Sequence, residues 1–262
     1  MHVTRRRLLG TALAASVMQG ATGLTVRAQE ATPGPGPIAT PDTDGINGPG
    51  FGIARVRTHS IPELAQAVYP DVMFRLLPST AALSDYFGYI FAFDDADPRS
   101  TINVTLLGDA WAADEANAVA EAYVEGMDPR LTPETPITEQ GEVRIYQLTD
   151  RPASELPPLL HGCHITMRHR RNAPDTDIEG VIRSASEGFG PILATMDGFV
   201  LYCWMHAAGG RVSFNIWETA EQLEAGNVAV ADFVAANPVI TSEGETVVHN
   251  GVIGYSDLLM RN

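Results

Sequence analysis

The sequence contains no lysine, so every one of its 17 basic residues is arginine. This absence excludes Schiff-base chemistry and any other mechanism that needs a lysine amine. Basic residues are also outnumbered, because 32 acidic residues give the 262-residue chain a formal net charge of −15. A surface of this sign repels phosphate backbones, so we expect no nucleic-acid partner.

Cysteine is scarce as well, since Cys163 and Cys203 are the only two. Two thiols allow one disulfide at most, and a chain of this length can bury a core without a disulfide framework. His161, Cys163 and His164 bring potential metal ligands together in sequence. Alternation along a strand would turn His164 away from the other two, so we expect no metal site.

The amino-terminal residues have the layout of a signal peptide. Arg5, Arg6 and Arg7 precede an uncharged stretch, Leu8–Val26, and a small residue, Ala28, ends the segment. The run T-R-R-R-L-L resembles the twin-arginine motif, which directs export of folded proteins. We therefore predict a signal peptide over residues 1–28 and a secreted or extracytoplasmic protein.

An uncleaved amino-terminal anchor is the alternative to a cleaved signal. Gly10, Gly20 and Gly23 make the segment a poor membrane span. No later stretch is apolar for long enough to cross a bilayer, so we expect no membrane span in the mature chain. Residues 29–50 are mainly proline, glycine, threonine and alanine, which indicates a disordered linker.

An internal repeat follows from Phe51 onward. Residues 88–124 align without a gap on residues 198–234, an offset of 110, and residues 137–142 align on 240–245, an offset of 103. The repeat predicts two tandem units, residues 51–152 and 160–262. Asn117 and Asn227 coincide inside helices where asparagine is a poor helix former, and we interpret them as serving the fold.

Each unit reads strand, helix, strand, strand, helix, strand, which is the ferredoxin-like arrangement. In the second unit, Thr176 and Thr219 are expected to cap its two helices. The ferredoxin-like strand order 4-1-3-2 would separate Cys163 from Cys203 by the third strand, or roughly 9–10 Å. A disulfide needs Cα atoms within about 7 Å, so two free thiols are predicted.

Residues 198–234 carry a family resemblance. They combine a Gly198-Phe199 strand entry, a Gly209-Gly210 hairpin and a helix with Asn227 before its last apolar turn. This pattern resembles the dimeric α/β-barrel proteins of the antibiotic-biosynthesis-monooxygenase type. The resemblance implies an α+β chain whose two tandem units form an intramolecular pseudo-dimeric α/β barrel, so that a monomer acts as a pseudo-dimer. The family includes oxygenases, isomerases, haem enzymes and proteins without known activity.

Strand alternation sorts the side chains of the second unit into two faces. The uniformly apolar face is expected to pack on the helices. It comprises Phe199, Leu201, Cys203, Met205, Val212, Phe214 and Ile216. The mixed face would line the interior, where ligands sit in the resembled barrels. It supplies candidate pocket walls and polar groups that could orient a ligand, namely Tyr202, Trp204, Trp217, Arg168, His164 and Asn215.

The alternative interpretation is that these residues only seal the interface between the two halves. On this alignment the first unit lacks the aromatic residues, so we expect one working pocket at most. The leading hypothesis is an exported protein that binds a small, partly aromatic molecule, and the resemblance makes monooxygenase-like activity a further hypothesis. A non-catalytic extracytoplasmic interaction domain is the alternative from another class.

A haem-binding or haem-processing protein is the second alternative function. The segment Ala194–Gly198 is similar to the G-x-x-D-G run of dye-decolourising peroxidases, but Ala194 replaces the first glycine. Turn residues explain the segment better, so no cofactor is expected. The chain has no G-x-S-x-G elbow, phosphate-binding loop or H-E-x-x-H motif.

Overall fold

Eight antiparallel strands close into a barrel in the computed structural model, which describes residues 48–240 and 243–258. The predicted signal peptide (residues 1–28) lies outside the described residues, as does all but the end of the predicted linker (residues 29–50). Within the described part of the chain, no helix has the length and apolar character that a membrane span requires.

The elements follow the predicted order in each half. The first half contains β1 (Phe51–Thr58), α1 (Pro62–Asp71), η1 (Val72–Leu76), α2 (Leu77–Ala81), β2 (Tyr86–Asp94), β3 (Ser100–Leu107), α3 (Ala110–Glu125) and β4 (Ile137–Leu148). Two short turns, η2 (Ala153–Glu155) and η3 (Pro158–Leu160), lead to the second half. It contains β5 (His164–Arg171), α4 (Ile178–Arg183), η4 (Ser184–Phe189), α5 (Gly190–Ala194), β6 (Phe199–Ala207), β7 (Gly210–Trp217), α6 (Ala220–Ala236), η5 (Pro238–Ile240) and β8 (Glu243–Ser256).

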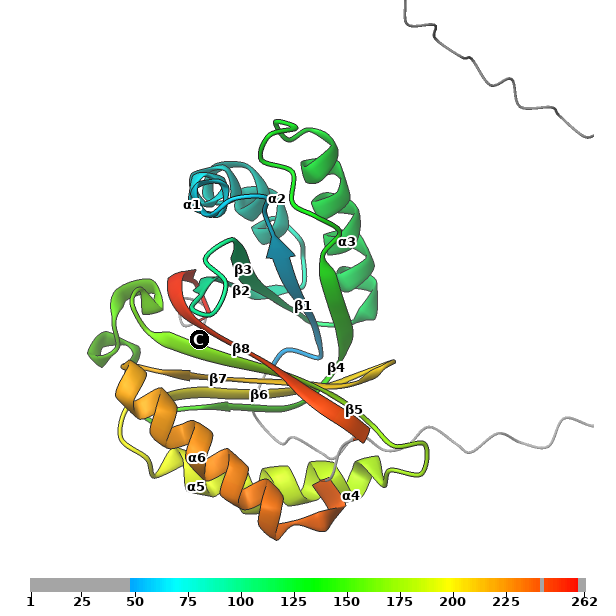
Figure 1. Ribbon diagram of the computed structural model, residues 1–262, viewed down its shortest axis with the longest axis vertical. Helices are drawn as coiled ribbons and strands as arrows, with labels where there is room; N and C mark the ends of the chain where they lie inside the picture. The colour runs from blue at the N-terminus through cyan, green and yellow to red at the C-terminus, as the bar shows by residue number, and fades with distance from the viewer. Residues whose placement is uncertain (1–47, 241–242, 259–262) are drawn as a thin grey trace, which may run out of the picture. The chain divides into compact units, whose positions relative to one another are not determined.

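Each half is a βαββαβ unit with its own four-stranded sheet. The strand order is β4-β1-β3-β2 in the first unit and β8-β5-β7-β6 in the second. Pairing of β2 with β8 and of β4 with β6 joins the sheets and closes the barrel. Helices α1 to α3 cover one sheet and α4 to α6 cover the other (Figure 1). The predicted fold class, two ferredoxin-like units in one pseudo-dimeric barrel, is confirmed.

Strand registers show which positions of the two units are equivalent. Tyr89 pairs with Thr105 in the first hairpin as Tyr202 pairs with Asn215 in the second. β2 and β6 are therefore equivalent at an offset of 113, whereas β3 and β7 keep the offset of 110. The two offsets differ because the loop of residues 95–99 is longer than the turn at 208–209. The ungapped alignment missed this difference and wrongly indicated that the first unit lacks the aromatic residues. Tyr89, for example, is equivalent to Tyr202.

The last strands are equivalent at an offset of 110. Ile137 of β4 pairs with Val56, and Val247 of β8 pairs with the equivalent position on β5. This register makes Gly141 equivalent to Gly251. A Cβ at either glycine would overlap the backbone of the neighbouring strand, at 2.0 Å and 2.4 Å from a carbonyl oxygen. The offset of 103 that the sequence alignment used for this block therefore does not align equivalent positions.

The two faces of the sheets are reversed relative to the sequence prediction. The apolar set of the second unit packs in the barrel interior against the equivalent face of the first unit, and its members there are Leu201, Cys203, Met205, Val212, Phe214 and Ile216. The mixed face lies under the helices, where Tyr202, Trp204 and Trp217 pack against α4, η4 and α6. A closed eight-stranded barrel fills its interior with side chains, so the wholly apolar face belongs there.

Phe199 is the exception in that set, since it lies under the helices with its ring centroid 5.6 Å from that of Trp217. The pairing of β6 with β7 shifts register between Phe199 and Leu201. Such a bulge adds one residue and reverses the alternation on one side of it.

The helix between the first two strands has the same irregularity in both units. A π-helical segment, η1 or η4, interrupts it just before Pro78 or Pro191. Proline lacks an N–H and its ring clashes with the carbonyl four residues earlier, so the wider turn accommodates it. Helix α4 is capped by Asp177, which accepts from the Gly180 N–H, and not by Thr176 as predicted. The predicted capping box at Thr219 is confirmed.

Both cysteines are free, as predicted, and both are buried. Cys203 lies on β6, and Cys163 directly precedes β5. Strand β7 separates β5 from β6, so the sheet keeps the two thiols apart.

Candidate functional site

A groove of about 630 Å³ opens in the first unit between β1, β4, α3 and the segment 133–136. Small-molecule sites have volumes of about 300–1,000 Å³. Arg55 and Arg57 of β1 lie in this groove with Asn117 of α3 and Gln140 of β4, while Ala120 contributes apolar surface. The groove therefore has the size and mixed lining of a ligand site.

Arg55 is held in place from α3. It is 8% exposed, and its Nη2 donates a short hydrogen bond to Asn117 Oδ1. Asn117 Nδ2 in turn donates to Gln140 Oε1 at 2.9 Å, which connects β1, α3 and β4. Burial, together with the charge of Arg57, lowers the pKa of Arg55 to about 10, so the guanidinium stays protonated at neutral pH.

Arg57 is the less constrained of the two cations. No hydrogen bond or ion pair joins its guanidinium to any described residue, and Arg55 likewise has no carboxylate partner among them. Burial lowers the pKa of Arg57, while the nearby Tyr89 and Tyr123 raise it. Five N–H donors in a planar fork suit bidentate binding of a carboxylate, so Arg57 offers an unused anion-binding group.

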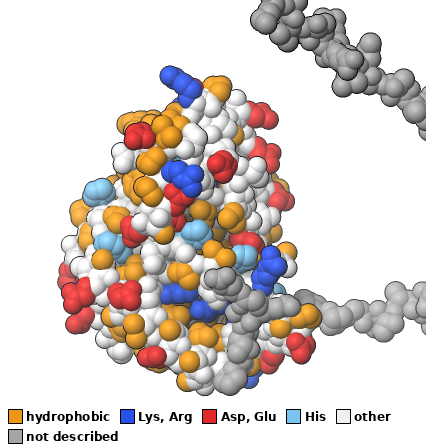
Figure 2. Space-filling model, in the orientation of Figure 1, with side chains coloured by type: hydrophobic (Ala, Val, Ile, Leu, Met, Phe, Trp, Pro, Cys, Tyr) orange, Lys and Arg blue, Asp and Glu red, His pale blue; other side chains and the backbone are white. Residues whose placement is uncertain are grey.

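The mouth of the groove carries charge of the opposite sign. Glu121, Glu125 and Glu134 line it and are exposed. The charge of Glu121 opposes the lowering of the Arg55 pKa without forming an ion pair. The groove is thus positive at its floor on β1 and negative at its rim. Acidic side chains are also spread over the face of the molecule in Figure 2.

The second unit has a counterpart of this site that is closed. Arg168 is equivalent to Arg55, and its Nη2 donates to Asn227 Oδ1 as Arg55 donates to Asn117. Arg168 lines a cavity of about 20 Å³ with Arg170, Tyr202 and Trp204. This volume admits about one water molecule. The coinciding asparagines of the two units thus both position an arginine.

Differences on the helices explain why one site is open and the other closed. Ala120 and Glu121 of α3 correspond to Val230 and Ala231 of α6, so a larger apolar side chain fills the second unit. Phe233, the counterpart of Tyr123, also lines the closed cavity, and its ring centroid lies 5.1 Å from that of Phe189. The longer connection after α3 leads to the segment 133–136, which forms one wall of the open groove.

The sequence-predicted site residues are only partly brought together. Arg168, Tyr202 and Trp204 line the small cavity. Asn215 and Trp217 are fully buried beneath α6 but do not line it. The amide of Asn215 and the indole nitrogen of Trp217 have no hydrogen-bond partner among the described residues. His164 lies at the start of β5, opposite Trp217, and is half-buried.

Haem does not fit the residues of either site. Haem iron is held by histidine, cysteine, methionine or tyrosine. None of the side chains lining the open groove is of these types. Tyr202 is of the right type, but its cavity of about 20 Å³ is far too small for a porphyrin. Among the side chains that the structure describes, no three of histidine, cysteine or acidic type cluster as metal ligands.

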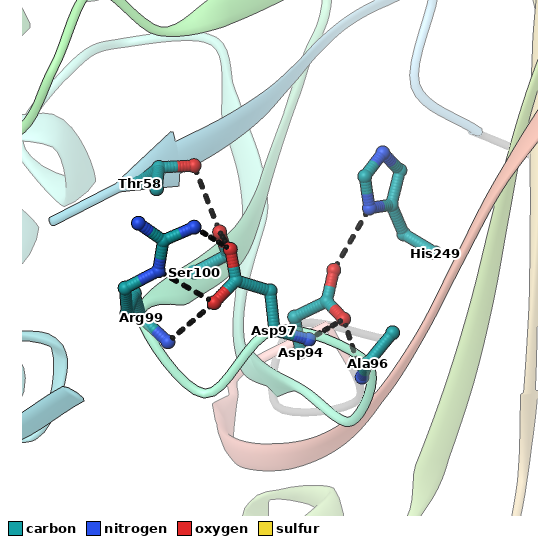
Figure 3. A network of polar contacts seen from close by, with 7 residues as sticks. All are labelled: Thr58, Asp94, Ala96, Asp97, Arg99, Ser100 and His249. Atoms are coloured by element: carbon teal, nitrogen blue, oxygen red, sulfur yellow. Dashed lines mark hydrogen bonds and ion pairs between the residues drawn. The ribbon is translucent and has the colours of Figure 1, made fainter. Parts of the chain in front are cut away.

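A polar network at one end of the barrel has a structural role. Asp94, at the end of β2, accepts hydrogen bonds from the N–H groups of Ala96 and Asp97 and lies 2.8 Å from Nδ1 of His249 on β8 (Figure 3). Arg99 forms an ion pair with Asp97 at 2.8 Å. These contacts fix the longer hairpin loop of the first unit against β8.

Comparisons with known proteins identify the fold. No family model and no curated protein matches the sequence. A protein from Fusobacterium nucleatum assigned as a monooxygenase superposes with a TM-score of 0.61 at 9% identity over 80% of this chain and 95% of its own. One from Lactobacillus acidophilus, also assigned as a monooxygenase, gives 0.59 at 10% identity over 81% and 97%.

An anthrone oxidase-like protein gives a TM-score of 0.56 at 13% identity, over 79% of this chain and 92% of its own. The likeness shows the fold alone. At such identities it does not carry catalytic residues from these proteins to this chain, so the function has to be argued from the site.

Sequence reasoning missed the open groove because it assigned the working pocket to the second unit. One signal was available. The first strand of each unit contains Arg-x-Arg, as Arg55-Val56-Arg57 and Arg168-His169-Arg170, and each unit has an asparagine at the matching place in its last helix. Two arginines on the helix-covered face of a strand are unusual enough to indicate a site in both units.

Proposed function

We propose that the protein binds a small molecule with one anionic group, such as a carboxylate or phenolate, in the groove of the first unit. The proposal depends chiefly on Arg57, a cation in a groove of about 630 Å³ without a carboxylate partner among the described residues. Arg55, fixed by Asn117, lies beside it. Two guanidinium groups side by side on β1, at the floor of the groove, favour the binding of an anion.

The remaining lining narrows the class of ligand. Ala120, Val124 and Pro136 provide apolar surface for an aliphatic or aromatic body. Carboxylates at the rim, among them Glu121 and Glu134, repel a second anionic group and attract a donor or a cation. A monoanion or a zwitterion therefore fits better than a dianion.

Titration calorimetry with matched pairs of compounds tests the proposal. Phenylacetate and phenylacetamide have the same body and differ in charge, so only the acid should bind measurably. The variant Arg57→Gln should weaken phenylacetate binding about 10- to 100-fold, because hydrogen bonds to a charged group contribute about 1.5–3 kcal/mol. Arg183→Gln, which removes an exposed arginine of the second unit, is the matched control and should bind as wild type.

Equal binding of the acid and the amide would contradict the anion site, as would unchanged affinity in Arg57→Gln. If neither carboxylates nor phenolates bind, the alternative of a non-catalytic interaction domain takes the place of this proposal. Export through the twin-arginine signal is part of the same proposal and depends on the arginines at positions 5–7.

Monooxygenase-like chemistry on the bound ligand is the second candidate. The assignment of two structures with this fold as monooxygenases favours it. Oxygen consumption measured with an electrode should rise when a ligand that binds in calorimetry is added, and the rise should be lost in Arg57→Gln. Binding without oxygen uptake would leave the binding function alone.

A further inference from the structure

Three arginines of the second unit gather on the helix-covered face of its sheet. Arg168 and Arg170 are two residues apart on β5, and Arg211 lies opposite Arg170 on β7. Arg168 is 6% exposed and Arg211 only 1%, so neither guanidinium reaches bulk solvent. Arg168 and Arg170 both line the small closed cavity.

Among the described residues, Arg168 and Arg211 have neutral partners only, and no hydrogen bond or ion pair joins the guanidinium of Arg170. Arg168 donates to Asn227, and Arg211 donates to Asn172 Oδ1 and to the carbonyl oxygen of Ile240 at 2.5 Å. Among the described residues, no acceptor is found for the buried Nε of Arg211. Burying cations without a counter-charge is costly, and here three of them repel one another.

Their mutual repulsion is reflected in their acid–base properties. Burial and the charge of Arg170 lower the pKa of both Arg168 and Arg211 to about 10. Arg168 and Arg211 therefore remain charged at neutral pH, and burial also lowers the pKa of Arg170. Burial raises the pKa of Tyr202, although the three arginines oppose the rise, so its phenol stays protonated and can donate a hydrogen bond. Every ionisable group around the cavity is then a cation or a neutral donor.

The size of the cavity restricts what can supply the missing charge. About 20 Å³ is available, and Val181, Val230 and Phe233 form apolar walls. A single atom or a water molecule fits, whereas a hydrated or polyatomic ion such as sulfate does not. Water would fill the space but would leave the three charges uncompensated.

We infer that this cavity binds a monovalent anion of about the size of chloride, held by Arg168 and Arg170 with hydrogen bonds from Tyr202 and Ser213. This site differs from the groove of the proposed function, because it lies in the other unit and has no room for an organic ligand. It stabilises the fold of the second unit by neutralising buried charge. The same Arg–Asn pair thus serves a ligand site in one unit and an ion site in the other.

Thermal unfolding of the full mature chain in different sodium salts, at constant ionic strength, tests the inference. Chloride and bromide should raise Tm in a saturable manner relative to gluconate, which is too large to enter. At 100 times the Kd, binding to the folded state alone should raise Tm by about 5–10 °C. Equal Tm values in chloride and gluconate would overturn the inference.

Variants separate a specific site from a general salt effect. Ala185 lines the cavity, so Ala185→Val places methyl groups in it and should abolish the halide-dependent rise while leaving all three arginines. Arg168→Gln should weaken halide binding at least tenfold. Arg183→Gln removes an exposed arginine and should keep the full rise. A rise that persists in Ala185→Val would be a general salt effect and would refute the site.

Crystals of the wild-type protein grown in bromide show directly whether an anion occupies the cavity, and this test needs no variant. An anomalous peak between the guanidiniums of Arg168 and Arg170 is expected. Bromide peaks confined to other places on the protein would refute the assignment, even if the salt raised Tm.

Discussion

Replacing Gly226 by alanine should destabilise the protein, although alanine is the better helix former. Gly226 lies within α6, directly over the indole of Trp217 at the end of β7. A Cβ built on Gly226 would lie 2.3 Å from Cζ2 and 2.6 Å from Cε2 of Trp217. Trp217 is fully buried and packs against Phe199 on another side, so it has little freedom to retreat.

The expected size follows from two opposing effects. Alanine gains about 1 kcal/mol over glycine in a helix interior. Overpacking a core costs about 1–3 kcal/mol, and a contact this short with a rigid ring belongs near the upper end of that range. The free energy of unfolding of Gly226→Ala should therefore fall by about 2 kcal/mol.

Trp217→Phe removes the indole atoms that the new methyl would overlap. The lost packing costs about 1–3 kcal/mol. The buried indole N–H has no acceptor among the residues that the structure describes. Removing an unpaired donor offsets part of that cost, so we expect a net loss of about 1 kcal/mol. In the double variant the alanine methyl occupies the vacated space, and stability should return to within about 1 kcal/mol of wild type.

Urea denaturation of the wild type, both single variants and the double variant measures the coupling between the two positions. We expect about 2–3 kcal/mol of favourable coupling. Single-variant effects that add within about 0.5 kcal/mol would show that the methyl and the indole do not meet, and would refute the packing of Gly226 of α6 on Trp217 of β7.

Three further predictions concern pH, thiols and export. Burial lowers the pKa of His59, so below about pH 6.5 the unfolded chain binds a proton that the folded chain does not, and stability falls as pH falls. His59→Leu should reduce this fall in urea titrations between about pH 7.5 and about pH 5, and an unchanged slope would contradict the assignment. Burial raises the pKa of Cys163 to about 12 and also raises that of Cys203, so a thiol reagent should label neither in the native protein and both in denaturant. Rapid labelling of the native protein would refute their burial. Changing Arg5, Arg6 and Arg7 to Gln should retain the precursor in the cytoplasm, and unchanged export would exclude the twin-arginine signal.

The candidate site was only partly accessible from the sequence. Strand alternation correctly grouped Arg168, Tyr202 and Trp204 on one face, because the two-residue period is local. It did not reveal that the equivalent face of the first unit is the open one. That difference arises from Ala120 in place of a valine and from the segment 133–136, which lies against β1 only after the chain has folded.

The order of strands and helices and the helix cap at Thr219 follow from the sequence, because turns, caps and hydrophobic periods are encoded within a few residues. The pairing of the two βαββαβ units was an expectation from the family resemblance of residues 198–234. The tertiary structure alone decided which face of each sheet points inward. Barrel closure joins β2 to β8 and β4 to β6, which are distant in sequence, and it excludes polar side chains from the interior. It also decided the register between the units, because a loop of different length at residues 95–99 changes which side chains are equivalent without changing the periodicity that the sequence displays.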